Sequence, residues 1–262
     1  MFAPACAKLS PHGGARHESP DLLRSAVGPG KLDYEIYLST QKLLSCQKPF
    51  DALVNADELQ FQIVHQVEEL WMKLIAATLL DIDDHLRAGH AHKVVTLFHR
   101  CNLVLGMMSD QLALLETMSP HDYQAIRLQL GNGSGQESPG FRILMRMPME
   151  LWETFDAHYV SGRGRTVRAI YDTDYRHDDA YVIAEAMMEF DERMAKFRSN
   201  HVFLIHRSIG MGSASLKGRS VDLLEAGARH RFFPELWNVR AEMTDAWGQT
   251  YGKVRDSLPA AE

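Results

Sequence analysis

Cysteine is scarce in this chain of 262 residues, and the few cysteines present exclude the common sulfur-based sites. Cys6, Cys46 and Cys101 are odd in number and scattered, and no Cys-x-x-Cys pair occurs. We therefore expect neither a structural zinc site nor a disulfide framework. Such usage is typical of a reducing compartment, so the sequence predicts a cytoplasmic protein.

Long apolar runs and basic clusters are also missing. No apolar run reaches the roughly 18 residues of a membrane helix, and the N-terminus lacks the apolar core of a signal peptide. The net charge is −6 without a basic stripe, which argues against nucleic acid and anionic membrane surfaces as partners. The chain has 45% apolar and 24% charged residues, as a globular protein with a sizeable core does.

Alternating strand patterns are scarce too, so we expect an all-α fold with almost no sheet. Glycine and proline are dense in residues 1–30, which predicts a flexible N-terminal segment. A single helical domain is expected over residues 31–255, followed by a frayed tail at 256–262. Long helices are predicted at about 92–118 and 179–209, and a helical stretch at 141–160 is predicted to break or kink at Pro148.

The stretch from Asp57 to Ile75 predicts the helix around which the chain is organised. Its apolar residues repeat at alternating steps of four and three, which predicts one apolar stripe on a mostly buried helix: Ile63, Val67, Leu70 and Leu74. Phe61 and His65 are four apart and share a face. Gln66 and Glu69 add polar groups that need partners, so the helix either lines a cavity or is hydrogen-bonded to its neighbours. A buried structural histidine remains the commoner outcome for His65 alone.

A second stripe runs along the helix predicted at 179–209, again at steps of four and three: Ile183, Met187, Phe190, Met194, Phe197, His201 and Leu204. His201 therefore lies on a core-facing stripe. An imidazole there needs a partner for its nitrogens, and a metal ion is one such partner. A structural role for a lone histidine stays open.

Two smaller patterns are a tyrosine–arginine pair that could bind a carboxylate and a pair of tyrosines that could close a pocket. Tyr123 and Arg127 are four apart on one helical face, and arginine is well shaped to hold a carboxylate through two hydrogen bonds. A surface arginine is the alternative. Tyr34 and Tyr37 are either packing residues or aromatics that close a pocket.

Five segments in order, from about residue 32 to 240, have counterparts in one known family: LDYEIYL, FQIVHQVEELWMKLI, MSPHDYQAIRLQLGNGSGQESPGFR, FRSNHVFLIHRSIG and RFFPELWNVR. They resemble the tryptophan 2,3-dioxygenase patterns YxxYL, LFIxQHQxxELWxKL, MTPxxYxxxRxxLGxxSGFQSxQYR, WRxxHxxxVxRxIG and LFPELWxxR. The resemblance implies an all-α bundle of long helices enclosing a haem pocket, as in tryptophan and indoleamine 2,3-dioxygenases.

The resemblance also implies a role for each matching residue. His201 matches the proximal ligand of the iron of haem b, and His65 matches the distal histidine that contacts the indole N–H. Phe61 matches the aromatic that packs on the substrate ring. Arg127 and Tyr123 match the pair that holds the amino-acid carboxylate.

Three further positions, and the partners, follow from the same resemblance. Ser215 matches a threonine that binds the substrate ammonium group, so a hydroxyl is kept. Tyr34 and Tyr37 match an N-terminal aromatic segment that reaches into the neighbouring subunit's site. The resemblance thus implies a homo-oligomer, a tetramer by family resemblance, with O2 as co-substrate.

Two loops depart from the family pattern. The loop Ala214–Ser220 is ASLKGRS, in which Leu216 and Lys217 replace two glycines that tolerate positive φ. The segment SGQES has Gln136 and Glu137 where the pattern has Phe and Gln. Both changes lie in parts that sense substrate shape, so we expect them to affect the choice of substrate.

The expected function is therefore haem-dependent oxygenation of L-tryptophan or a tryptophan derivative. The main hypothesis is insertion of O2 across indole C2–C3, giving an N-formylkynurenine-type product. The alternative is mono-oxygenation of a β-substituted tryptophan to a 2-oxindole or hydroxylated product in secondary metabolism. A haem-binding sensor without turnover and a haem-free helical interaction protein are weaker rivals.

Overall fold

The computed structural model describes residues 28, 30–131, 133, 135–173, 176–213 and 227–248. Regular structure in these ranges is helical and no strand occurs in them, so the predicted all-α fold is confirmed. Nearly all of the predicted flexible segment, the predicted tail at 256–262 and the loop Ala214–Ser220 lie outside the described residues.

The long helices predicted from the sequence are present, and those predicted at about 92–118 and 179–209 begin and end within three residues of the predicted positions. Pro148 lies in the first turn of the second of two helices into which the 141–160 stretch divides. In chain order they are α2 (Asp33–Leu38), α3 (Thr40–Leu43), α4 (Glu58–Arg87), α5 (Ala91–Leu115), α6 (Pro120–Gln129), α7 (Pro139–Leu144), α8 (Met147–Tyr159), α9 (Val167–Tyr171), α10 (Asp179–Ile209) and α12 (Pro234–Gly248), with 3-10 turns η2 (Phe50–Ala52), η3 (Gly135–Glu137) and η4 (Ser161–Arg163).

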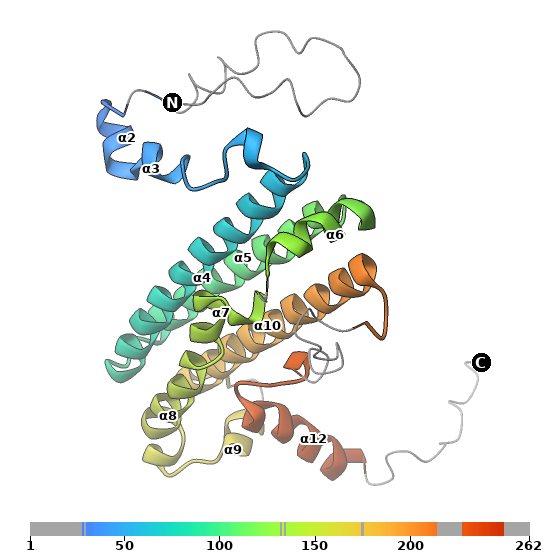
Figure 1. Cartoon of the computed structure of the whole chain (residues 1–262). Helices are drawn as coiled ribbons and strands as arrows, with labels where there is room; N and C mark the ends of the chain where they lie inside the picture. The colour runs from blue at the N-terminus through green and yellow to red at the C-terminus, as the bar shows by residue number, and fades with distance from the viewer. Residues whose placement is uncertain are drawn as a thin grey trace, which may run out of the picture.

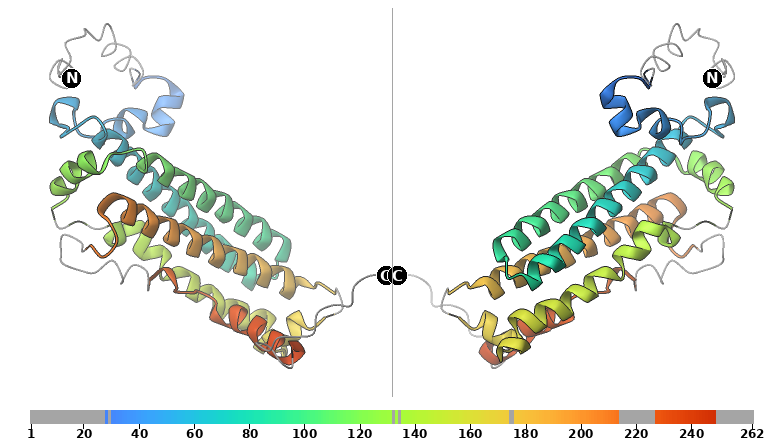
Figure 2. Two further views of the ribbon diagram at one scale, coloured as in Figure 1. Left: turned by 90° about the vertical axis from the view of Figure 1, so that its right-hand side faces the viewer. Right: turned by 90° about the vertical axis from the view of Figure 1, so that its left-hand side faces the viewer.

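Three long helices, α4, α5 and α10, lie side by side and form the body of the molecule (Figure 1). The chain reverses between α4 and α5 at Gly89, whose φ of 73° is one that glycine adopts without strain. The shorter α7 and α8 pack on α4. Helices α9 and α12 lie at one end of the bundle, whereas α2 and α3 lie beyond the other end (Figure 2).

Side-chain caps determine where the helices around the site begin. Ser119 and Ser138 accept hydrogen bonds from backbone N–H groups three residues ahead, and Pro120 and Pro139 follow them in the first turn. Asp178 caps α10 in the same way. These caps satisfy N–H groups that helix geometry leaves without partners, so α6, α7 and α10 start at defined residues.

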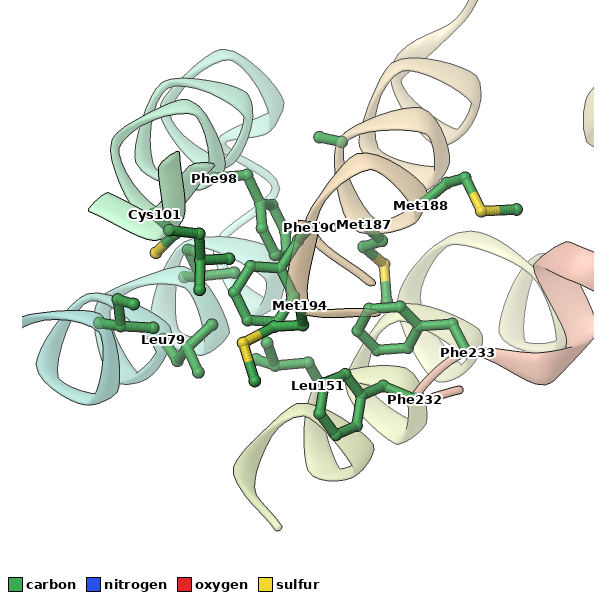
Figure 3. Close-up of a cluster of buried hydrophobic side chains, with 14 of the residues drawn as sticks. Leu79, Phe98, Cys101, Leu151, Met187, Met188, Phe190, Met194, Phe232 and Phe233 are labelled. Carbon is green, nitrogen blue, oxygen red and sulfur yellow. The ribbon is translucent and has the colours of Figure 1, made fainter. Parts of the chain in front are cut away.

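The core lies where α4, α5, α8 and α10 meet (Figure 3). The ring of Phe190 on α10 lies 5.8 Å from Phe98 of α5 and 6.3 Å from Phe232, measured between centroids. Leu79 of α4 and Leu151 of α8 complete this cluster. The predicted α10 stripe is confirmed as buried in its apolar members, Ile183, Met187, Phe190, Met194, Phe197 and Leu204, whereas His201 is half-buried.

A buried carboxylate joins the end of the chain to α10. Oδ2 of Asp191 accepts hydrogen bonds from the backbone N–H groups of Phe232 and Phe233, at 2.9 and 3.1 Å, and from Nε1 of Trp237 at 3.0 Å. Three donors on one oxygen offset the cost of burying this acid. The segment before Pro234, where α12 begins, is thereby held against the bundle.

The prediction for α4 named the wrong face. Ile63, Leu70 and Leu74 are 43%, 49% and 38% exposed, so the stripe predicted to be buried lies largely at the surface. The face that packs on the bundle is the next one round the helix: Val64, Glu68, Met72, Ile75, Leu79, Ile82 and Leu86. Both faces are rich in apolar residues, and helical spacing alone does not distinguish which of two such faces meets the neighbouring helices.

Candidate functional site

A cavity of about 1000 Å³ opens between α4, α7 and α10. Its α4 wall is one helical face, spaced three, one and three residues apart: His65, Glu68, Glu69 and Met72. Its α10 wall consists of Phe197, Arg198, His201 and Val202. The two histidines predicted from separate stripes thus line the same cavity from two different helices.

The hydrogen bond of His65 determines which ring nitrogen faces the cavity as an acceptor. Nδ1 lies 2.7 Å from the carbonyl oxygen of Phe61, which only accepts, so Nδ1 carries the proton. Burial lowers the pKa of His65, opposed by this hydrogen bond and by Glu69, so the ring is neutral at neutral pH. Nε2 therefore carries a lone pair that can accept a hydrogen bond. The ring of Phe61 lies over His65 with centroids 4.1 Å apart, as the spacing predicted.

His201 is a neutral imidazole. Burial, with a smaller contribution from His65, lowers its pKa to about 4. No hydrogen bond to its ring occurs within the described part of the chain. Gly135 lies opposite Nε2, and a Cβ at that position would lie 3.9 Å from the nitrogen. A neutral histidine with a side-chain-free residue before its nitrogen is suited to ligate a metal carried by a cofactor.

Two adjacent acids lie in the same cavity wall. Glu69 is anchored because its Oε2 accepts the backbone N–H of Gly140 at 3.0 Å, which ties α7 to α4. This contact requires glycine, since a Cβ at position 140 would lie 2.8 Å from Cβ of Met72. Glu68 is 8% exposed, and burial together with the charge of Glu69 raises its pKa to about 7. Oε1 of each acid is buried without a hydrogen-bond partner among the described residues.

Arginines give the cavity positive charge. Arg198 is buried, and its side chain donates to the carbonyl oxygens of Met194 and His230 at 3.3 and 2.6 Å. Burial lowers its pKa to about 10, which leaves it a cation at neutral pH. Arg142 and Arg146 line the cavity from the α7 side and are exposed. An anionic ligand group has cations available at that rim.

The predicted carboxylate-binding pair lies beside Phe61 rather than in the wall of this cavity. The ring of Tyr123 lies 6.4 Å from that of Phe61, and burial raises the pKa of Tyr123. Arg127 donates to Oε1 of Gln124 at 3.4 Å. A second cavity of about 570 Å³ lies between α4, α6 and the chain before η2, and Phe61 and His65 line it. Of these two residues, His65 also lines the large cavity, so it borders both.

The other predicted site residues are two tyrosines, which lie away from the cavity of their own chain, and Ser215. Tyr34 and Tyr37 lie on α2, 72% and 86% exposed, beyond the end of the bundle (Figure 2). They line neither of the two cavities. Ser215 lies outside the described residues, as do Leu216 and Lys217.

Sequence reasoning missed two cavity residues, Glu68 and Arg198. Each is three positions from a predicted histidine, so each lies on the same helical face as that histidine. The spacing was available as a signal. For Glu68, the signal was missed because the neighbouring α4 face was predicted to be the buried one; for Arg198, the stripe of apolar residues on α10 drew attention to the positions on either side of it.

Within the described ranges, no three His, Cys, Asp or Glu side chains come together in a way that could hold a metal ion. No helix in that part of the chain has both the length and the apolar character to span a membrane. Cys46 is an exposed free thiol and Cys101 a buried one, whose pKa burial raises to about 12.

Comparison with known proteins gives a consistent result. The family model described as tryptophan 2,3-dioxygenase matches residues 18–147 and 155–243. A tryptophan 2,3-dioxygenase of Myxococcus xanthus is 28% identical, in an alignment that covers 82% of this chain and 91% of that protein. Proteins of the same name from Serratia proteamaculans and Saccharopolyspora erythraea are 26% and 27% identical, over 81% and 88% of this chain and 94% and 99% of theirs.

Proposed function

The chain belongs to the tryptophan 2,3-dioxygenase family, and we propose that it is a haem-dependent enzyme that adds O2 across C2–C3 of an indole amino acid. The substrate is L-tryptophan or a tryptophan derivative. Both oxygen atoms enter the product, the C2–C3 bond breaks, and an N-formylkynurenine-type ketone and formamide result. No external reductant is consumed, because the four electrons that reduce O2 come from the substrate.

One observation carries the proposal: two neutral imidazoles, His65 and His201, line one cavity from different helices. A single neutral histidine is the axial ligand that many haem proteins use. The second histidine then serves the substrate. The cavity of about 1000 Å³ is at the upper end of the range for small-molecule and cofactor sites, roughly 300–1,000 Å³.

The residues present fit a haem. Nε2 of His201 faces Gly135, where a Cβ would lie 3.9 Å away, so the space before the nitrogen is kept clear by the absence of a side chain. Arg142, Arg146 and Arg198 supply cations for the carboxylates of the haem edge. His201 would hold the iron, and the bound haem would supply the chemistry that activates O2.

The chain's own residues bind and orient the substrate. Nε2 of His65 accepts the indole N–H, since Nδ1 is already engaged with Phe61. The ring of Phe61 packs on the indole. Arg127, beside Tyr123 on α6, binds the carboxylate through charge-assisted hydrogen bonds. Two anchors at opposite ends of the substrate determine which edge of the indole faces the haem, and this placement is the protein's contribution to the rate.

We further infer that the protein is a homo-oligomer, a tetramer as in the family pattern. Helices α2 and α3 have no buried residue, and helices this short are marginal alone in water. A second copy would cover Tyr34 and Tyr37 and place them at its own site. The outer faces of α4 and α5 also carry large exposed apolar side chains: Ile63, Leu70, Leu74, Leu103, Met107 and Leu114.

Two smaller proposals complete this picture. One domain over residues 31–255 is supported by the single hydrophobic cluster that α4, α5, α8, α10 and the segment before α12 share. A cytoplasmic location is supported by the free thiols of Cys46 and Cys101.

Sedimentation of the purified protein tests the proposed homo-oligomer, and a monomer at micromolar concentration would refute it.

The decisive test of the function is haem reconstitution followed by turnover with ¹⁸O2 and L-tryptophan. A Soret band with one haem per chain, and a product that contains two labelled oxygens, is the expected result. A product with one labelled oxygen would show that the reaction is mono-oxygenation rather than ring cleavage. A protein that refuses haem would refute the proposal altogether.

A further inference from the structure

Glu68 occupies a place in the structure that is unusual for an acid. It lies in the buried face of α4 between Val64 and Met72, and it is 8% exposed. It also lines the large cavity, one helical turn from His65. An acid in a buried stripe is costly unless its oxygens have partners.

No such partner occurs in the described part of the chain. Oε1 of Glu68 is buried and accepts no hydrogen bond. The neighbouring acid, Glu69, differs because its Oε2 is bonded to the backbone of α7. A buried polar group without a partner is destabilising, because it has given up its hydrogen bonds to water. Because Glu68 also lines the cavity and its other oxygen, Oε2, is not among the buried unpaired atoms, a bound ligand that reaches this wall can offer the carboxyl group a partner.

The position of Glu68 relative to the other substrate contacts indicates which part of the ligand it meets. Phe61, His65 and Glu68 follow one another along α4; His65 and Glu68 line the large cavity, whereas Phe61 lines the second one beside Tyr123. A substrate whose N–H is at His65 and whose benzene ring lies in the large cavity extends along this wall toward Glu68. Three residues of helix rise by about 4.5 Å, comparable with the step from the pyrrole nitrogen across to the benzene ring.

We propose that Glu68 determines substrate specificity: its cavity-facing carboxyl group hydrogen-bonds a hydroxyl or amino substituent on the benzene ring of an indole amino acid. The preferred substrate is then a ring-hydroxylated or ring-aminated tryptophan rather than tryptophan itself. This inference rests on the proposed function, because it concerns the same cavity and the same substrate pose.

The chemistry of the carboxyl group suits such a substituent. With a pKa raised to about 7, Glu68 is present as both acid and carboxylate at neutral pH, so it can donate or accept. A hydroxyl group does both as well. A methyl group of similar size does neither and would leave the oxygen unpaired, which a site built for a hydroxyl disfavours. The titratable and charged groups that line the cavity with it are His65 and Glu69 on α4, Arg142 and Arg146 on the α7 side, and Arg198 and His201 on α10.

The test compares matched pairs of ligands on the haem-loaded full-length protein. Hydroxytryptophans and the methyltryptophans substituted at the same ring position are titrated, and the shift of the Soret band gives each Kd. In the wild type, at least one hydroxyl isomer should bind about tenfold more tightly than its methyl counterpart, the ratio that one hydrogen bond of ordinary strength supports.

Three variants separate Glu68 from a general effect on the fold. Glu68→Met should bring that ratio to about one while tryptophan affinity stays within about twofold, because only the hydrogen bond is lost. Glu68→Gln should keep most of the ratio, since an amide still donates and accepts. Asp81→Asn, an exposed acid of the same helix, should leave the ratio unchanged.

The outcomes distinguish this inference from the function on which it rests. Equal affinities for hydroxyl and methyl pairs in the wild type would mean that water alone satisfies Glu68, and would overturn the specificity role. An equal preference in wild type and Glu68→Met would overturn it too. If tryptophan still yields a doubly ¹⁸O-labelled product in those cases, the proposed function stands. If the preference holds without turnover, the dioxygenase function fails and the binding role stands.

Discussion

The two halves of α4 differ in what their buried side chains do. From Ile75 onward the buried face is closely packed and apolar except for Thr78, whose hydroxyl donates to the carbonyl oxygen of Leu74, and Leu79 and Ile82 are at most 1% exposed. Before Ile75 this face carries Glu68, which lines the cavity together with His65 one turn earlier. One continuous helix thus serves the core at one end and a cavity at the other.

This difference separates stability from function along one element. The packed half gains hydrophobic free energy from each side chain, and its neighbours on α5 and α10 are apolar. In the cavity half, Oε1 of Glu68 and Oε1 of Glu69 are buried without partners among the described residues, and both acids line the cavity. Other such atoms are spread over the molecule, including Oδ1 of Asp83 in the packed half, but the two glutamates are the adjacent pair that a ligand in the cavity would adjoin.

The largest effect is expected from the α10 side of the cavity. His201→Ala should abolish haem retention, because it removes the imidazole of the α10 wall and leaves only His65 on the α4 wall, where we assign it to the substrate, while the helical far-UV circular dichroism stays unchanged. The measurement is the Soret absorbance per chain after reconstitution. His206→Ala, on the same helix but not in the cavity wall, is the control. A normal Soret band in His201→Ala would contradict the ligand assignment.

The packed half of α4 should respond in the opposite way. Leu79→Ala should lower the free energy of unfolding by about 2–5 kcal/mol, because it removes a fully buried side chain and leaves a cavity in the core. Haem stoichiometry should be retained at low temperature. Denaturant unfolding measures the loss, and Leu80→Ala, at a position 61% exposed, should change stability by no more than about 0.5 kcal/mol. Similar losses in both variants would contradict this division of α4.

The cavity half should show a pH dependence that the packed half lacks. The pKa of Glu68 is raised from 4.5 to about 7, so the folded protein holds this proton more tightly than the unfolded chain. The associated stability is present below about pH 4.5 and is lost as pH rises through about 7. Relative to Glu68→Gln, the wild type should lose up to roughly 3 kcal/mol between pH 5 and 8. Parallel stability curves for the two proteins would show that Glu68 does not titrate in this range.

The smallest predicted effect concerns substrate binding at the α6 side. Arg127→Ala should raise the KM for an indole amino acid by about tenfold or more, because a charge-assisted hydrogen bond to the carboxylate is lost. The change in kcat should be smaller, since the haem and His65 remain in place. Steady-state kinetics test this, with Arg193→Ala on the exposed face of α10 as the control. An unchanged KM would remove Arg127 from the carboxylate site.

The comparison of α4 with α10 shows how far helical spacing predicts burial. In α10 one stripe is apolar and the opposite side is charged. The spacing therefore identified the buried apolar residues of this helix, and the predicted first and last residues of the helix were correct. In α4 two faces are apolar, and the spacing selected the one that lies at the surface. That face became informative only once its exposure was known, because an apolar surface of this kind is typical of an interface.

The sequence by itself determined the helical class, most helix boundaries, the proline breaks and the positions of His65 and His201 on their helices, because these depend on local spacing and capping. Only the tertiary structure decided that the two histidines line one cavity, that Gly135 lies before Nε2 of His201, and that Glu68 is buried without a partner. Such relations join residues far apart in the chain, and they follow from how the helices pack rather than from the pattern along any one of them.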